Sequence, residues 1–201
     1  MSKVSVYMDA CCFIDLAAMK LDLETEAGRE NHIYFCRKLL EAARAKEALV
    51  YTSFATIVEC GHVVDLSRPS GQQKIWTPEV QRLFRGLLQS GSSGVLPVAT
   101  TPLVTERALD LKWKHNITCR AMDALHLASA LKAGCTHFIT TDNFGTTNIA
   151  GLALLGLVVC RAEAVSNLLP SKYSQIEMVA QLSGKLKTDG GTRAPLAASP
   201  A

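Results

Sequence analysis

The chain has 201 residues, enough for one domain with a full hydrophobic core. Hydrophobic residues make up 48% of it and charged residues 19%, a balance that excludes an intrinsically disordered protein. The formal net charge of +3 is too small to indicate nucleic-acid binding by itself, and it leaves room for a local basic patch.

The sequence shows no signal for a membrane or for secretion. No apolar run is long enough to span a bilayer, and the N-terminus lacks the basic start, apolar core and cleavage site of a signal peptide. The seven Cys residues are odd in number and scattered, without a C-x-x-C pair, which argues against a disulfide framework and a zinc ribbon. We therefore expect a cytoplasmic protein with reduced, mostly buried thiols and no membrane partner.

Strand-like and helix-like patterns alternate along the chain. Alternating apolar residues at Val4, Val6 and Met8 predict a strand that ends on Asp9. Further short β-branched or aromatic runs predict strands at residues 48–52, 95–99, 136–140 and 155–160. Residues 13–19 are predicted to form a short helix or a turn. Apolar residues at helical spacing predict helices at residues 31–46, 54–66, 78–89, 102–114, 121–133 and 162–169.

The order of these elements indicates an α/β fold. Strands separated by helices imply a mainly parallel sheet with helices on both faces, whose strand order the pattern leaves open. Residues 68–76 are predicted to form a loop, and residues 90–94 a flexible connector. We expect one domain over residues 1–170 and a C-terminal extension over residues 171–201. From about residue 183 the composition turns to Gly, Thr, Pro, Ala and Ser, which indicates disorder.

Four acidic residues lie near the carboxyl ends of predicted strands or on helices that leave those ends. Asp9 ends the first strand, and Glu59 lies in the helix that follows the second. Asp123 lies in the first turn of an apolar helix, and Asp142 follows the strand at residues 136–140. The carboxyl ends of parallel strands meet at one edge of the sheet, so we expect these acids to converge there. Crowded carboxylates resist ionisation unless a divalent cation joins them, and oxygen ligands favour Mg²⁺ or Mn²⁺.

Each acid also has a purely structural interpretation. Asp9 and Asp142 can be turn residues, and Asp123 can be a helix N-terminal acid that the helix dipole favours. Glu59 is the hardest to explain in this way, because a Glu near the apolar face of a helix needs a partner. The order and spacing of the four acids together favour a functional site.

Residues beside these acids are candidates for substrate binding. Thr141 and Asn143 flank the last acid and can hydrogen-bond a ligand, although strand-end residues often have only a structural role. Arg120 precedes Asp123, where it can contact a negatively charged ligand or simply lie on a solvated helix face. His126 follows Asp123 by about one helical turn and can orient a carboxylate, although a packed or surface His is the more common case.

At this point the chain resembles a known family. Four segments in this order are similar to the acidic motifs of PIN domains: MDACCFIDL, TIVECGH, AMDALHLASAL and FITTDNF. The resemblance covers about residues 3–161, and AMDALHLASA looks most like VapC-type toxins of toxin–antitoxin pairs.

The resemblance implies a PIN-like three-layer α/β/α sandwich that acts as a metal-dependent endoribonuclease. Its catalytic and metal-binding acids would be Asp9, Glu59, Asp123 and Asp142, with Mg²⁺ or Mn²⁺ as the cofactor. RNA would be the substrate, and a small antitoxin protein and a second copy of the chain would be partners. The chain departs from many relatives at Cys11, where they have a polar residue.

Two other functions remain open. An Asp-nucleophile phosphatase of the haloacid dehalogenase type also has an acid after the first strand, but it needs a second Asp two residues later, where Cys11 stands. A non-catalytic RNA- or protein-binding module on the same fold does not need every acid, whereas this chain has all four.

Overall fold

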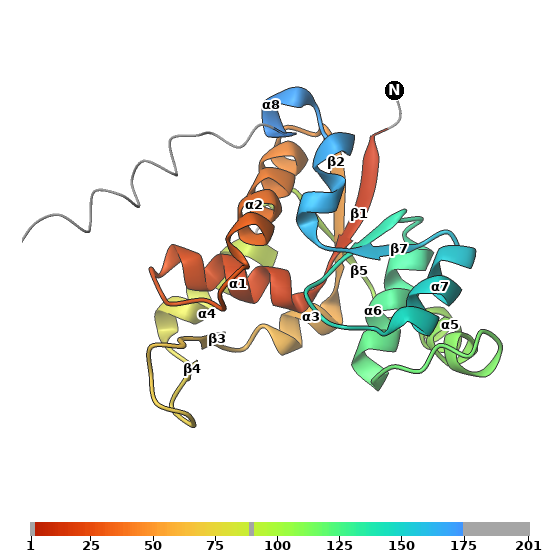
Figure 1. The fold of residues 1–201 in the computed structure, drawn as a ribbon, viewed down its shortest axis with the longest axis horizontal. Helices are drawn as coiled ribbons and strands as arrows, with labels where there is room; N and C mark the ends of the chain where they lie inside the picture. Colours follow the sequence, from red (N-terminus) through yellow and green to blue (C-terminus); the bar gives the residue numbers. More distant parts are fainter. Residues whose placement is uncertain (1–2, 89–90, 175–201) are drawn as a thin grey trace, which may run out of the picture.

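The strand β1 (Val4–Met8) lies at the centre of the sheet and so places Asp9 at the middle of its carboxyl edge. The computed structural model describes residues 3–88 and 91–174, whose main sheet has the strand order β5-β2-β1-β6-β7 (Figure 1). Every neighbouring pair in it is parallel. The other four strands are β2 (Ala48–Ser53), β5 (Val95–Val98), β6 (His137–Ile139) and β7 (Val158–Cys160).

Helices cover both faces of this sheet, which confirms the predicted α/β/α sandwich. Successive side chains of a strand point to opposite faces, so Val6 and Met8 enter one core and Tyr7 enters the other. The first core is closed by α1 (Ala10–Lys20), α2 (Glu30–Arg44) and α4 (Pro78–Leu88). The second core is closed by α5 (Pro102–Trp113), α6 (Ala121–Lys132) and α7 (Thr146–Leu154).

Two strand-to-helix junctions at the carboxyl edge are set by capping side chains. Asp9 accepts a hydrogen bond from the amide of Ala10 at 2.8 Å, so α1 begins at Ala10 and not at the predicted residue 13. Ser53 accepts a bond from the amide of Thr56 and caps α3 (Phe54–Glu59). Both helices therefore leave the sheet directly at its carboxyl edge.

The predicted helix at residues 54–66 is wrong after Glu59. The chain instead forms β3 (Val63–Val64), which pairs with β4 (Lys74–Ile75) as an antiparallel hairpin within the predicted loop. Val63 is fully buried against the first core, and this tertiary contact outweighs the local helical pattern. The hairpin extends the molecule beyond α1 and α4 (Figure 1).

Other differences lie in connecting segments. The described part of the predicted connector, residues 91–94, is anchored, because Ser93 is buried and Gly94 packs against the backbone of Ala43 and Arg44. The helix α7 was not predicted, and the predicted helix at residues 162–169 is a 3₁₀ helix, η1 (Ala162–Leu168).

The described part of the chain ends in a short helix, α8 (Ser171–Ser174). It packs on α2 and contributes the buried Tyr173 to the first core. The disorder predicted from about residue 183 lies outside the described residues. Among the residues that are described, none of the helices has the length and hydrophobicity that a membrane crossing requires.

Candidate active site

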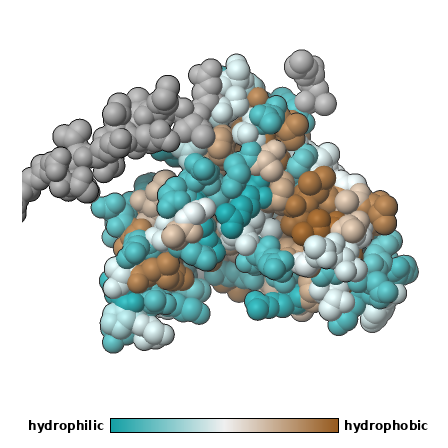
Figure 2. Space-filling view, in the orientation of Figure 1, coloured by the Kyte–Doolittle hydropathy of each residue, from teal (hydrophilic) through white to brown (hydrophobic). Residues whose placement is uncertain are grey.

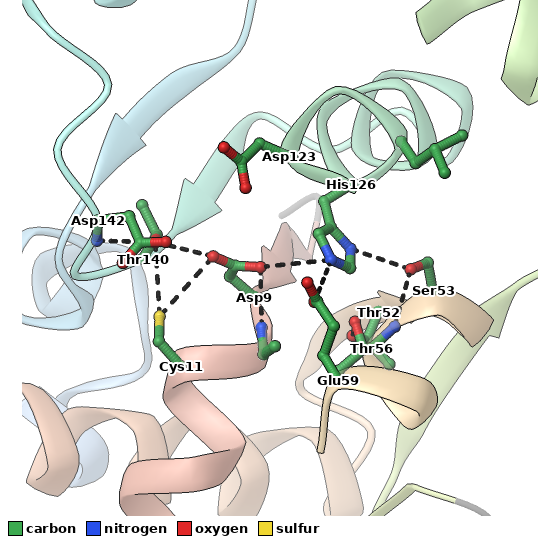
Figure 3. Close-up of polar contacts among 12 residues, drawn as sticks. Asp9, Cys11, Thr52, Ser53, Thr56, Glu59, Asp123, His126, Thr140 and Asp142 are labelled. Carbon is green, nitrogen blue, oxygen red and sulfur yellow. Dashed lines mark hydrogen bonds and ion pairs between the residues drawn. The ribbon is translucent and has the colours of Figure 1, made fainter. Parts of the chain in front are cut away.

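The Asp9 carboxylate lies at the centre of the carboxyl edge, and its side chain is almost completely buried. Besides the amide of Ala10, the hydroxyl of Thr140 donates to this carboxylate, at 2.9 Å from Oδ2, and the thiol of Cys11 lies 3.8 Å from the same oxygen (Figure 3). Burial raises the pKa of Asp9 to about 6, and the nearby His126 and the two donors offset only part of this effect. Asp9 is therefore a dehydrated carboxyl group that ionises less readily than an exposed Asp, and a further positive partner would favour its charged form.

Glu59 is the last residue of α3, and its carboxylate is held by a histidine. Oε2 of Glu59 lies 2.6 Å from Nε2 of His126, which is on α6 on the other face of the sheet. The same Nε2 lies 3.9 Å from Oδ1 of Asp9 (Figure 3). The structure thus gives Glu59 the partner that its position in the sequence required.

His126 is only 1% exposed and connects the site to the second core. Its Nδ1 lies 2.8 Å from the hydroxyl of Tyr7 and 3.0 Å from the hydroxyl of Ser53. Burial lowers the pKa of His126, but the hydrogen bond to Glu59 and the charges of Asp9 and Glu59 outweigh burial, so the net shift is upward. In the sequence, the only signal for this role is the one-turn spacing from Asp123, and a His at such a spacing is more often a packed or surface residue.

The other two predicted acids are not part of the close group of Asp9, Glu59 and His126, and they border a cavity of about 290 Å³. Asp123, in the first turn of α6, accepts a hydrogen bond from the amide of Arg120 at 3.2 Å. Asp142 follows β6, and its amide donates to the hydroxyl of Thr140 at 3.0 Å. Burial and, less strongly, the charge of Asp142 raise the pKa of Asp123, so the two carboxylates repel each other across this cavity.

The predicted substrate-binding residues divide between two cavities. Arg120 and Asn143 line the cavity that contains Asp123, although Oδ1 of Asn143 also accepts a bond from the amide of Gly145. Thr141 lines a neighbouring cavity, and its hydroxyl oxygen is buried with no hydrogen-bond partner within the described residues. All three residues therefore lie beside the acids.

The side chains at this edge fit a divalent cation. One ligand atom each from Asp9, Glu59 and His126 lies within 4.8 Å of the others. The short bond from His126 to a carboxylate requires a proton on Nε2, and that nitrogen cannot ligate a metal while the bond persists. The available ligands are therefore carboxylate oxygens, which suit a divalent cation, and His126 positions Glu59.

A second cluster, formed by Cys12, His32 and Cys36, also brings possible metal ligands within 4.8 Å of one another, but its atoms are engaged in hydrogen bonds. Nε2 of His32 lies 3.6 Å from Sγ of Cys12 and 3.4 Å from Sγ of Cys36. Nδ1 of His32 accepts a hydrogen bond from the amide of Ala162 at 3.1 Å, which places the proton of the neutral ring on Nε2. The cluster is therefore a buried hydrogen-bonded group, and it offers no free imidazole ligand.

Cys11 takes part in positioning the acids. Its Sγ lies 3.4 Å from the hydroxyl of Thr140 and accepts a bond from the amide of Thr141, also at 3.4 Å. No second carboxylate follows Asp9 at this position, and a phosphatase that uses Asp9 as its nucleophile lacks the acid it needs.

A parallel α/β sheet with carboxylates gathered at its carboxyl edge defines a class of metal-dependent hydrolases and phosphotransferases. Within that class, the family model of the PIN domain matches residues 6–144. The chain belongs to the PIN domain family, whose members are typically metal-dependent nucleases. No curated protein and no solved structure matches the chain.

Proposed function

We propose that the chain is a Mg²⁺- or Mn²⁺-dependent endoribonuclease that hydrolyses RNA phosphodiester bonds. The observation that carries this proposal is the meeting of Asp9 and Glu59, which bring carboxylate oxygens within 4.8 Å of each other, with Asp123 and Asp142 bordering a cavity at the same edge of the sheet (Figure 3). Such a group is costly in free energy without a cation, and family membership favours a nuclease.

The residues of the chain have separate roles in this proposal. Asp9, Glu59, Asp123 and Asp142 would hold the ion. When bound, the ion would supply an activated water and would neutralise negative charge on the phosphoryl oxygens. Thr140 and the amide of Ala10 orient Asp9, and His126 orients Glu59. Arg120 brings positive charge to the cavity, where it contacts the RNA backbone.

RNA cleavage by the purified protein tests this function. Single-stranded and structured RNA are incubated with wild type, Asp9→Asn and Asp123→Asn, with and without Mg²⁺ or Mn²⁺. We expect cleavage only with the cation, and a loss of about 100-fold or more in either variant. The matched control is Asp110→Asn, which removes a carboxylate that pairs with Lys114 on the surface of α5.

Three outcomes would contradict the proposal. Unchanged cleavage by both Asn variants excludes the mechanism. RNA binding without cleavage under every metal condition indicates the non-catalytic module. Release of phosphate from a small ester, with RNA left intact, indicates the phosphatase.

We also propose that the nuclease is the toxin of a toxin–antitoxin pair, acting in the cytoplasm as a homodimer that a small antitoxin protein inhibits. The support is the similarity of the α6 sequence AMDALHLASA to VapC-type toxins. Induced expression in bacteria should arrest growth for wild type and not for Asp9→Asn. Unimpaired growth with active, soluble wild-type protein would exclude the toxin role and leave the nuclease activity unaffected.

A further inference from the structure

A second cavity, of about 530 Å³, lies beside the cavity of the acids. It is bounded by α1, the segment before α2, β3 and the loop after β6, and Asp142 lines both cavities. A volume in this range accommodates a small organic group such as a nucleobase. The contact of Asp142 with both cavities makes them neighbouring parts of one groove.

The walls of this second cavity are mainly apolar. Ile14, Ala18, Val64 and Leu66 contribute aliphatic surface, and hydrophobic surface is visible over β3 in Figure 2, bordered by hydrophilic surface. A flat aromatic ring gains free energy when it moves from water onto such surface.

One polar group is built into the wall. Nη1 of Arg29 donates to both carboxylate oxygens of Asp15 at 3.1 Å, and Nη2 lies 2.5 Å from Oε2 of Glu26. The Asp15 side chain is only 9% exposed, and its buried charge needs Arg29 as a partner, so this pair is explained by stability alone. Glu26 is 63% exposed and is not required to keep a buried charge paired.

The charges of this wall disfavour a phosphate. Asp15 and Glu26 carry two negative charges against the one positive charge of Arg29, and Asp142 at the junction adds another negative charge. A further anion would be repelled, whereas a neutral ring with hydrogen-bonding edges would not. Asp142 and Thr141 place this wall next to the site proposed for phosphodiester cleavage.

We infer that this cavity binds a nucleobase of the RNA substrate, with guanine preferred, and that Glu26 and Arg29 read its edge. The inference rests on the proposed nuclease function. Guanine carries two adjacent acceptors, N7 and O6, followed by the N1–H and N2–H donors. Arg29 and Glu26 are already joined through Nη2 and Oε2, so the base would be read by the second hydrogen of Nη2 and by Oε1, a donor beside an acceptor, which is the complementary order. Adenine has a donor where guanine has O6, and pyrimidines lack N7.

Cleavage of RNA with defined guanine positions tests this inference. Otherwise identical single-stranded RNAs carry one guanine or one adenine at each position, and the cleavage sites are mapped. We expect the wild type to cut at a constant offset from guanine, with a preference over adenine of about tenfold or more. Glu26→Gln places an amide donor where an acceptor is needed and should remove most of that preference. Glu24→Gln, in the same acidic segment but outside the cavity lining, should keep it.

A binding experiment without metal gives an independent result. Guanosine, adenosine, uridine and cytidine are titrated into the full chain without a divalent cation, and amide NMR signals are followed. We expect guanosine to shift signals of cavity residues such as Ile14, Ala18 and Leu66, and Glu26→Gln to weaken this response. Arg29→Lys keeps a positive charge beside Asp15 but lacks the guanidinium fork, so it should weaken the response as well.

The outcomes separate this inference from the nuclease proposal. Cleavage of RNA without a preference for guanine, together with no shift by guanosine, overturns the base site and leaves the nuclease intact. Specific shifts by guanosine in a protein that never cuts RNA support the base site and remove the nuclease. A preference for another base, unchanged in Glu26→Gln, overturns the reading by Glu26 and Arg29.

Discussion

Nε2 of His126 lies 2.6 Å from Oε2 of Glu59, and this bond joins α6 to α3 across the carboxyl edge of the sheet. The same imidazole contacts the hydroxyls of Tyr7 and Ser53, and it lies within 3.9 Å of Asp9. One buried side chain thereby connects both strand-to-helix junctions of the site. Residues that connect others in this way affect stability and activity together.

His126→Ala should therefore destabilise the fold and slow RNA cleavage. The variant leaves Glu59 and two buried hydroxyls without their partner, which costs about 2–3 kcal/mol of the free energy of unfolding. Cleavage should fall by about 10- to 100-fold, because Glu59 is no longer held in place. Denaturant unfolding and initial cleavage rates measure the two effects, and His137→Ala on β6 serves as the control.

A double variant separates positioning from direct catalysis. If His126 acts through Glu59, His126→Ala combined with Glu59→Gln should be about as slow as the slower single variant. If the double variant instead shows the product of the two single-variant losses in cleavage rate, His126 contributes to cleavage independently of Glu59.

Stabilisation by Mn²⁺ should depend on pH. The pKa of Asp9 is about 6 because its carboxyl is buried, so below about pH 6 a proton competes with the cation. A cation that binds only the folded state raises Tm, and this rise should be smaller at about pH 5 than at about pH 7.5. Thermal unfolding with and without Mn²⁺ measures the difference. The same rise in Asp9→Asn as in wild type would show that Mn²⁺ binds elsewhere.

His32 should make the fold less stable in acid. Burial, with smaller effects from the charges of Arg161 and Arg29, lowers the pKa of His32 from about 6.5 to about 4. Between these values the unfolded chain binds more protons, so the free energy of unfolding decreases as pH falls from about 6.5 to 4. The His32 contribution to this decrease is about 3 kcal/mol.

The matched variant for this test is His32→Asn. Its side-chain oxygen can still accept the bond from the amide of Ala162 but does not titrate in this range. Urea unfolding across pH should show a shallower decrease for the variant. The raised pKa of Asp9 stabilises the folded state in acid and affects both proteins equally, so it cancels in the comparison. Parallel pH profiles would refute the role of His32.

Gly94→Ala should be strongly destabilising. Gly94 has a φ of +76°, and a Cβ there would lie 2.7 Å from the backbone carbon of Ala43 and the nitrogen of Arg44. Backbone atoms of α2 cannot move aside easily, so we expect a loss of about 3 kcal/mol or more in the free energy of unfolding. Gly86→Ala is the control, because a Cβ at that position in α4 meets nothing within 4 Å and should raise stability by about 0.5–1 kcal/mol. Equal stability of the two variants would contradict the packing of the connector.

Much of the architecture was predictable because its signals are local. The alternation of Val4, Val6 and Met8 and the helical periodicity of α2 and α6 follow from which side chains face the core. The hairpin of β3 and β4 was not predictable in this way. Its strands have two residues each, and they are held by the burial of Val63 in a core that forms from distant segments.

The candidate site also has features that local sequence patterns predict and features that depend on contacts between distant residues. By itself the sequence determined the family and the parallel sandwich, and it indicated four candidate acids, because periodicity and motif order depend on residues that are close in the sequence. Only the tertiary structure decided that His126 holds Glu59, that Asp9 is dehydrated, and that Glu26 and Arg29 line a second cavity beside Asp142. Desolvation and pairing depend on which distant side chains exclude water from a carboxylate, and no local pattern records that.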